Sequence, residues 1–182
     1  MKKNIIPINL AVEDDLSEAV LRKIINNSSR NYAIGYCYKR SGFGYLKKNI
    51  NGFNNAAKGT PFFILTDLDN CICPPLKINE WLIGPKHQNL LFRIAVKEVE
   101  AWLLADIDNF SNYLSVSRNL LQNDVENIAD PKEYIISLAK HSRKKDIRDA
   151  LIPISDTARQ GPDYNSCLIT FVNNYWIIEN AC

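Results

Sequence analysis

Residues 61–70 read Pro-Phe-Phe-Ile-Leu-Thr-Asp-Leu-Asp-Asn, an almost wholly apolar run that ends directly in two aspartates. A continuous apolar run of this kind is typical of a strand that is buried on both faces, as in a parallel sheet. The two acids that follow it, Asp67 and Asp69, exceed what a turn requires. The stretch therefore predicts a buried parallel strand with a polar site at its carboxyl end.

Three further segments predict strands of the same sheet, at residues 5–12, 32–38 and 89–96. The segments that follow the strands have helical spacing, at residues 16–24, 45–57 and 76–82 and after residue 96. Strands that alternate with helices predict an α/β fold: a four-stranded parallel sheet with helices on both faces. With the strand order 2-1-3-4, right-handed crossovers place the switch in strand order between the first and third strands.

The C-terminal part of the chain predicts helices and no strand. Residues 131–140 and 165–178 have helical patterns, joined by a charged stretch and by Gly161-Pro162. We expect residues 1–106 to form the core and residues 107–182 to form a helical extension packed on it. The length of 182 residues fits a single compact domain of this kind.

The composition excludes several classes of protein. A hydrophobic content of 46% supports a globular core, and five cysteines without a Cys-x-x-Cys pair exclude a disulfide framework and a zinc ribbon. The net charge of +2 is too small to indicate a nucleic-acid binder by bulk charge, so any basic surface must be local. No apolar run approaches the roughly 20 residues that span a bilayer, and the N-terminus does not read as a signal peptide. We therefore expect a cytoplasmic protein without a membrane partner.

Acidic residues gather where the predicted strands end. Glu13 follows the first strand, Asp67 and Asp69 follow the third, and Glu98 and Glu100 follow the fourth. The carboxyl ends of parallel strands lie at one edge, and ligands bind there at the switch in strand order. Crowded carboxylates repel one another unless cations neutralise them, and all-oxygen ligands favour Mg²⁺ or Mn²⁺.

A structural role is the alternative for some of these acids. Glu13, Asp14 and Asp15 are residues that a helix N-terminus favours, and Glu98 and Glu100 would suit a helix dipole in the same way. Taken together, the five carboxylates favour a metal site.

The sequence resembles the Toprim nucleases, most closely the OLD-type branch and the small bacterial Toprim proteins encoded beside ABC-type ATPases in phage-defence systems. The resemblance rests on Ala11-Val12-Glu13, on Leu65-Thr66-Asp67-Leu68-Asp69 and on the segment from Ile94 to Asp106 that contains Glu98-Val-Glu100-Ala-Trp-Leu-Leu-Ala-Asp. It covers about residues 5–106. The family often has glycine after the first glutamate, whereas this chain has Asp14.

The resemblance implies a Toprim fold and metal-dependent hydrolysis of phosphodiester bonds in DNA or RNA, with no covalent nucleophile. Glu13, Asp67 and Asp69 would be the first metal ligands, and Glu98 and Glu100 would be available for a second Mg²⁺ or Mn²⁺ ion. A lysine often contacts the scissile phosphate in OLD-type sites. Lys132, in Asp130-Pro131-Lys132, is the candidate; the alternative is a solvated lysine at a helix start, and Lys97 is the second choice.

Two other functions are compatible with these residues. Asp67-Leu-Asp69-Asn-Cys71 resembles the nucleophile motif of haloacid-dehalogenase phosphatases, in which the first aspartate attacks phosphorus. That motif normally follows the first strand, however, and no Gly-Asp-x-x-x-Asp segment follows here. The non-enzymatic alternative is a partner subunit of an ATPase.

Nucleic acid would need a basic surface apart from the acidic edge. Residues 140–148 concentrate basic side chains, among them Arg143, Lys144 and Lys145, while Lys39 and Arg40 form a second candidate. A solvated helix face explains such a run equally well. By analogy with the resembling proteins we expect an ABC-type ATPase partner; a homo-oligomer also remains open, as does the choice between DNA and RNA, tRNA included.

Overall fold

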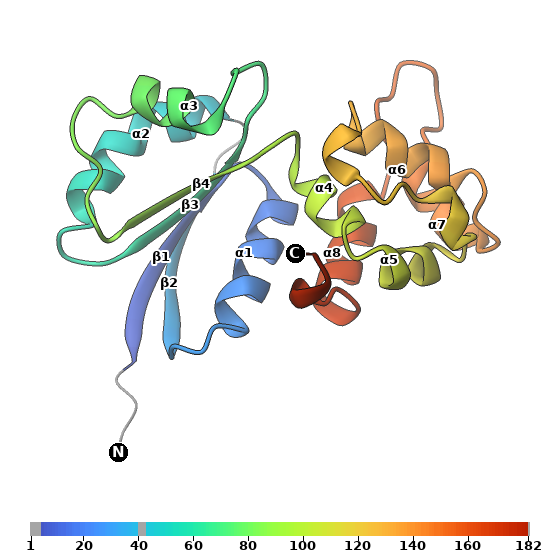
Figure 1. Ribbon diagram of the computed structural model, residues 1–182, viewed down its shortest axis with the longest axis horizontal. Coiled ribbons are helices and arrows are strands. Elements are labelled where there is room, and N and C mark those ends of the chain that lie inside the picture. Colours follow the sequence, from blue (N-terminus) through green and yellow to red (C-terminus); the bar gives the residue numbers. More distant parts are fainter. Residues whose placement is uncertain (1–4, 40–42, 182) are drawn as a thin grey trace. The chain divides into compact units, whose positions relative to one another are not determined.

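The computed structural model describes residues 5–39 and 43–181, and its described part contains a four-stranded sheet. The strands are β1 (Ile6–Val12), β2 (Tyr32–Lys39), β3 (Phe62–Asp67) and β4 (Leu90–Ala95). All neighbouring strands are parallel, and their order is β2-β1-β3-β4 (Figure 1). The predicted strands and their order are therefore confirmed.

Helices cover both faces of the sheet, as predicted. Helix α1 (Asp15–Asn26) lies on one face, and α2 (Phe43–Ala56) and α3 (Pro74–Trp81) lie on the other (Figure 1). The α2–α3 face is packed with aromatic rings: Phe53 and Phe62 stack with ring centroids 5.3 Å apart, and Trp81 lies 5.7 Å from Phe92. This packing holds α3 against β4.

An irregularity in the β1–β2 pairing explains a glycine in β2. Ile8 pairs with Ile34 and Leu10 pairs with Cys37, so Gly35 and Tyr36 share one position opposite Asn9. The Asn9 side chain accepts a hydrogen bond from the Tyr36 N–H at 2.9 Å, and a Cβ atom on Gly35 would lie 2.6 Å from that Asn9 oxygen. A side chain at position 35 would displace the Asn9 amide from this hydrogen bond, and glycine avoids that clash.

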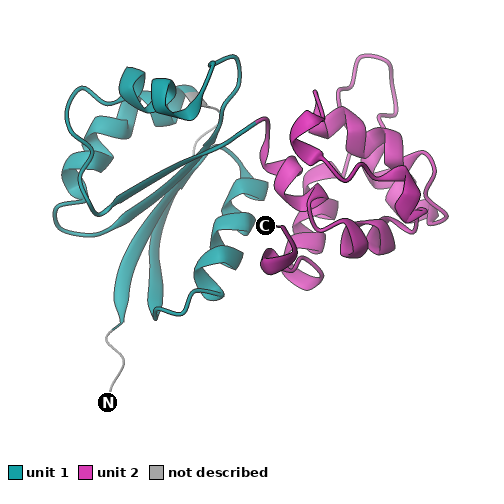
Figure 2. Cartoon of the chain, viewed as in Figure 1, with its two compact units in different colours: residues 1–96 teal, residues 97–182 magenta. Residues whose placement is uncertain are grey.

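The chain divides into two compact units, residues 1–96 and residues 97–182 (Figure 2). The described part of the second unit is helical and has no strand, as predicted. Its elements are α4 (Val99–Leu104), α5 (Ile107–Leu114), α6 (Pro131–Ala139), α7 (Lys145–Leu151) and α8 (Tyr164–Asn174), with short 3₁₀ helices at Arg118–Leu120, Val125–Asn127 and Ile178–Ala181.

The boundary between the units differs from the predicted one at residue 106. Helix α4 precedes residue 106, yet it packs against α5 and α6 of the second unit. The apolar residues that follow β4 thus pack in the helical unit. The sequence pattern does not show to which unit they belong. That the two parts form one compact domain stays a prediction.

Two findings concern the composition. The cysteines within the described residues form no disulfide. No helix in that part of the chain is long and apolar enough to cross a membrane.

Candidate functional site

Two of the predicted ligands lie at the carboxyl ends of neighbouring strands. Glu13 directly follows β1, and Asp67 is the last residue of β3, the strand that pairs with β1. The pairing register, in which Ala11 lies beside Ile64, brings both strand ends to one edge of the sheet. This edge lies entirely within the first unit, and we call Glu13, Asp67 and Asp69 the acidic edge.

The Glu13 carboxylate is held by its neighbour strand. The hydroxyl of Thr66, a side chain that is only 1% exposed, donates a hydrogen bond to Oε1 of Glu13. Burial raises the pKa of Glu13 above its ordinary value, and the negative charge of Asp69 adds to this, while the Thr66 hydrogen bond acts in the opposite direction. Glu13 is thus a partly desolvated carboxylate within electrostatic reach of Asp69.

A buried leucine separates the two aspartates of the acidic edge. Leu68 packs in the core on the α2–α3 face, and its N–H donates to the Ala95 carbonyl at 2.9 Å. Asp69 has a φ of 51°, in the left-handed region that few non-glycine residues adopt. The chain therefore turns sharply after Leu68, and the turn fixes the backbone that carries Asp69.

A buried lysine completes the acidic edge, and the sequence interpretation missed it. Lys77 of α3 is 4% exposed; its ammonium donates to the Asp67 carbonyl and lies 2.7 Å from Oδ2 of Asp69. The same ammonium lies 5.1 Å from the centre of the Trp81 ring. The spacing of Lys77 and Trp81 by four residues on a short amphipathic helix was the signal that both side chains face inward.

The possible ligand atoms at the acidic edge are carboxylate oxygens with a hydroxyl beside them. Oxygen ligands of this kind are the ones that a hard cation such as Mg²⁺ prefers. As the described residues lie, however, no group of three His, Cys, Asp or Glu side chains is arranged to hold a metal ion. Thr66 and Lys77 bind the carboxylates of Glu13 and Asp69 instead. Convergence of the three acids on one cation therefore stays a prediction.

The two acids after Glu13 have structural roles, as the alternative interpretation proposed. The Asp14 carboxylate caps α1 by accepting a hydrogen bond from the Ser17 N–H at 2.8 Å. Asp15 forms an ion pair with Lys39. The departure from glycine after Glu13 is explained by this capping role, since aspartate is a favoured N-cap residue.

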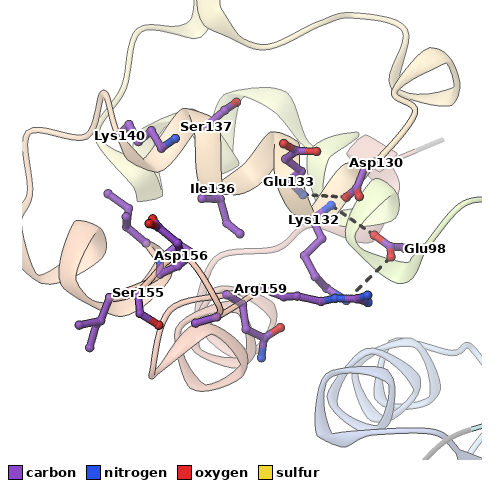
Figure 3. A pocket seen from close by; sticks show the side chains of 15 residues that line it. Glu98, Asp130, Lys132, Glu133, Ile136, Ser137, Lys140, Ser155, Asp156 and Arg159 are labelled. Carbon is purple, nitrogen blue, oxygen red and sulfur yellow. Dashed lines mark hydrogen bonds and ion pairs between the residues drawn. The ribbon is translucent and has the colours of Figure 1, made fainter.

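The other predicted site residues meet in the helical unit. The Lys132 N–H donates to Oε2 of Glu98 at 3.2 Å, and the Lys132 ammonium lies 3.8 Å from Glu98 (Figure 3). The same ammonium lies 3.6 Å from Glu100. Glu98 is the N-cap residue of α4, whereas Glu100, two residues later in the first turn, is 5% exposed. We call these three residues the Glu–Lys cluster. That it shares one metal site with the acidic edge stays a prediction.

Two helix starts fix the Glu–Lys cluster. Asp130 caps α6 by accepting from the Glu133 N–H at 2.8 Å, and Pro131 occupies the first turn (Figure 3). From α8, the fully buried Tyr164 has its hydroxyl 3.4 Å from Oε1 of Glu100. Burial and the negative charge of Glu100 raise the pKa of Tyr164, so this hydroxyl remains a hydrogen-bond donor. The sequence interpretation assigned no role to Tyr164.

The Glu–Lys cluster borders a cavity of about 940 Å³ between α6 and the segment 152–160. Lys132, Lys140 and Arg159 line it together with acidic residues, which are Glu98, Asp130, Glu133 and Asp156 (Figure 3). Four carboxylates against three cations give this cavity a mixed charge, so its composition alone does not favour a polyanion.

The predicted basic residues differ in their surroundings. Lys144 donates to the Tyr113 carbonyl at 3.0 Å, and Lys145 pairs with Asp149 at 3.2 Å; Arg143 is exposed. Lys39 contacts both Asp15 and Glu18, which raise its pKa through hydrogen bonds. Arg40 lies outside the described residues. Lys39 is therefore ion-paired, because β2 ends beside the acidic first turn of α1. A contact of Lys39 with nucleic acid stays a prediction.

The second-choice lysine lies on the surface. Lys97 is exposed and has a φ of 70°, in the left-handed region. It directly precedes Glu98, so the chain bends there as it enters α4.

Comparison with known proteins gives one structural similarity. No protein-family model matches the chain, and no curated protein matches it. Its structure is similar to the C-terminal region of the Burkholderia pseudomallei OLD protein, at 16% sequence identity and a TM-score of 0.39. The match covers 92% of this chain and 97% of that chain. At this identity and TM-score the similarity assigns no role to any residue of this chain.

Proposed function

We propose that the protein is a Mg²⁺- or Mn²⁺-dependent nuclease that hydrolyses phosphodiester bonds of DNA or RNA. The observation that carries the proposal is the placement of Glu13 beside the Asp67-Leu68-Asp69 turn, at the carboxyl edge of adjacent parallel strands. Partly desolvated carboxylates that lie within electrostatic reach of one another are typical of sites that take up a cation.

The residues of the acidic edge would each have a role in this reaction. Glu13, Asp67 and Asp69 supply carboxylate oxygens, and Thr66 orients the Glu13 carboxylate through its hydroxyl. A divalent cation held by such oxygens supplies charge stabilisation to a phosphoryl group and lowers the pKa of a bound water.

The Glu–Lys cluster supplies a positive charge for the substrate. Lys132 is the candidate to contact the scissile phosphate, because its ammonium is half-exposed and Glu98 and Glu100 hold it in place. Glu98 and Glu100 would position Lys132, and they would also be available to a second cation.

The experiment is a comparison of substrates with the purified protein. Supercoiled plasmid, linear DNA and tRNA are incubated with Mg²⁺ or Mn²⁺ and, separately, with EDTA. Cleavage that needs the cation supports the nuclease. Release of phosphate from small monoesters without cleavage of polynucleotide would instead support the haloacid-dehalogenase-like reaction. Absence of both activities, with and without a partner ATPase, would favour a non-catalytic subunit.

We propose further that the nuclease acts in anti-phage defence together with an ABC-type ATPase. This part rests on the resemblance in sequence to Toprim proteins that are encoded beside ABC-type ATPases. Co-expression with an ABC-type ATPase encoded next to the gene would test it: the two proteins should co-purify, and the ATPase should change the rate of cleavage. Independent elution with an unchanged rate would contradict it.

A further inference from the structure

Lys77 is a charged side chain in an unusual position. It is 4% exposed, yet it belongs to the eight-residue helix α3, whose other charged residue, Glu80, is exposed. A buried ammonium is costly unless it is paired and hydrogen-bonded. The groups that pair with the Lys77 ammonium therefore indicate its role.

The contacts of Lys77 are the groups of the acidic edge. Its ammonium donates to the Asp67 carbonyl, lies 2.7 Å from Oδ2 of Asp69 and lies over the Trp81 ring at 5.1 Å. The positive charge also acts on Glu13, whose pKa it lowers against the effect of burial. One ammonium thus supplies positive charge to two of the three carboxyl-bearing residues.

The geometry points to competition between Lys77 and a divalent cation. We propose that Lys77 is a positioning residue that holds Asp69 in the metal-free protein and gives up this contact when a cation is bound, so that Lys77 limits the affinity for the cation. The proposal rests on the metal site of the proposed function.

Two physical reasons support this competition. Oδ2 of Asp69 is engaged by the ammonium, so the same oxygen cannot serve as an unhindered ligand. Two positive charges held a few ångströms apart also repel each other strongly in a partly buried site.

Manganese binding provides the test, with the free Mn²⁺ signal in electron paramagnetic resonance as the readout. Lys77→Met keeps the apolar stem and removes the charge, and we expect it to bind Mn²⁺ at least about tenfold more tightly than the wild type. Lys77→Arg keeps the charge and should stay near the wild-type affinity. Lys86→Met, at an exposed lysine of the same unit, is the control for loss of one positive charge.

The outcomes separate this inference from the proposed function. Unchanged or weaker Mn²⁺ binding by Lys77→Met, with binding by the wild type, would overturn the role of Lys77 alone. Absence of binding in all variants would overturn both the inference and the metal site. Binding by Lys77→Met but not by the wild type would support the inference most strongly.

A second measurement is made on the wild type, and a variant is needed only to assign the signal. In a ¹³C spectrum of the lysine side chains, the Lys77 Cε signal is assigned by its loss in Lys77→Arg. Titration of the wild type with Mg²⁺ should shift this signal and saturate with the same midpoint as displacement of Mn²⁺. A signal that stays in place while Mg²⁺ displaces Mn²⁺ would overturn the proposal.

Discussion

The hydroxyl of Thr66, at the end of β3, donates a hydrogen bond to the carboxylate of Glu13, which follows β1. This contact joins the two strand ends at the acidic edge through a residue that the sequence interpretation did not assign to the site. It has a direct consequence for stability and for activity.

Replacement of Thr66 by valine should destabilise the fold by about 1–3 kcal/mol, because it leaves the partly buried Glu13 carboxylate without its donor. Nuclease activity should fall as well, since Glu13 loses its orientation. Thr66→Ser retains the hydroxyl and is the matched control. Urea unfolding at pH 7 checks the prediction, and equal free energies of unfolding for the valine and serine variants would contradict it.

Replacement of Lys132 by methionine should abolish cleavage and destabilise the helical unit by about 1–3 kcal/mol. The reason is that the buried Glu100 loses an ammonium 3.6 Å away. Lys58→Met, at an exposed lysine of the first unit, is the control. Thermal unfolding and plasmid nicking are measured together. Full activity in Lys132→Met would remove this lysine from the reaction.

The pH dependence of the free energy of unfolding should show the contribution of the Glu18 ion pairs. Burial raises the pKa of Glu18, but hydrogen bonds from Lys39 and Arg22 outweigh this and lower it below its ordinary value of 4.5. Ionised Glu18 therefore stabilises the folded state above pH 4.5, and this contribution is lost as the pH falls through the lowered folded-state pKa.

Glu18→Gln should accordingly lower the free energy of unfolding by about 0.5–1 kcal/mol at pH 7. The difference from the wild type should vanish in acid. Glu80→Gln, which removes an exposed pair with Lys47, is the control. Urea unfolding across pH 3–7 provides the measurement, and a Glu18→Gln difference that does not change with pH would be inconsistent with this ion pair.

Replacement of Lys144 and Lys145 by alanine tests the basic stretch. If these lysines follow a phosphate backbone, the double variant should flatten the slope of log affinity against log salt by about one to two units. Lys58 and Lys86 form the matched pair for control, because Lys86, like Lys144, donates to a backbone carbonyl. An unchanged slope in the Lys144/Lys145 variant would show that this stretch is a solvated helix face.

Much of the fold was predictable, because apolar runs and turns are local signals. The buried run at 61–66 and the Asp-x-Asp after it placed β3 and its carboxyl end correctly. The strand order 2-1-3-4 was assumed rather than derived, and the sheet has this order; the handedness of the crossovers gave only the position of the switch. The alternative role of Asp14 at a helix N-terminus was also predictable, since Asp14 caps α1 as an N-cap aspartate normally does.

The polar partners were not predictable from the sequence, because tertiary packing determines them. Thr66 and Tyr164 contact acids that are 53 and 64 residues away in the chain, and the buried Lys77 contacts Asp69 across the turn before α3. Asp106 is another buried polar residue: it is 1% exposed and accepts hydrogen bonds from Asn109, Ile177 and Asn180. Local patterns describe which face is apolar and carry no signal for such long-range pairs.

The most direct test of the proposed nuclease is Asp67→Asn, with Asp108→Asn as the control at an exposed aspartate that pairs with Arg118. Supercoiled plasmid and tRNA are incubated with each protein in Mg²⁺ or Mn²⁺, after circular dichroism has shown that the fold is kept. The wild type and Asp108→Asn should cleave, and Asp67→Asn should lose at least about a hundredfold in rate, because a neutral amide is a poor ligand for a hard cation. Full cleavage by Asp67→Asn would contradict the metal-dependent mechanism at the acidic edge.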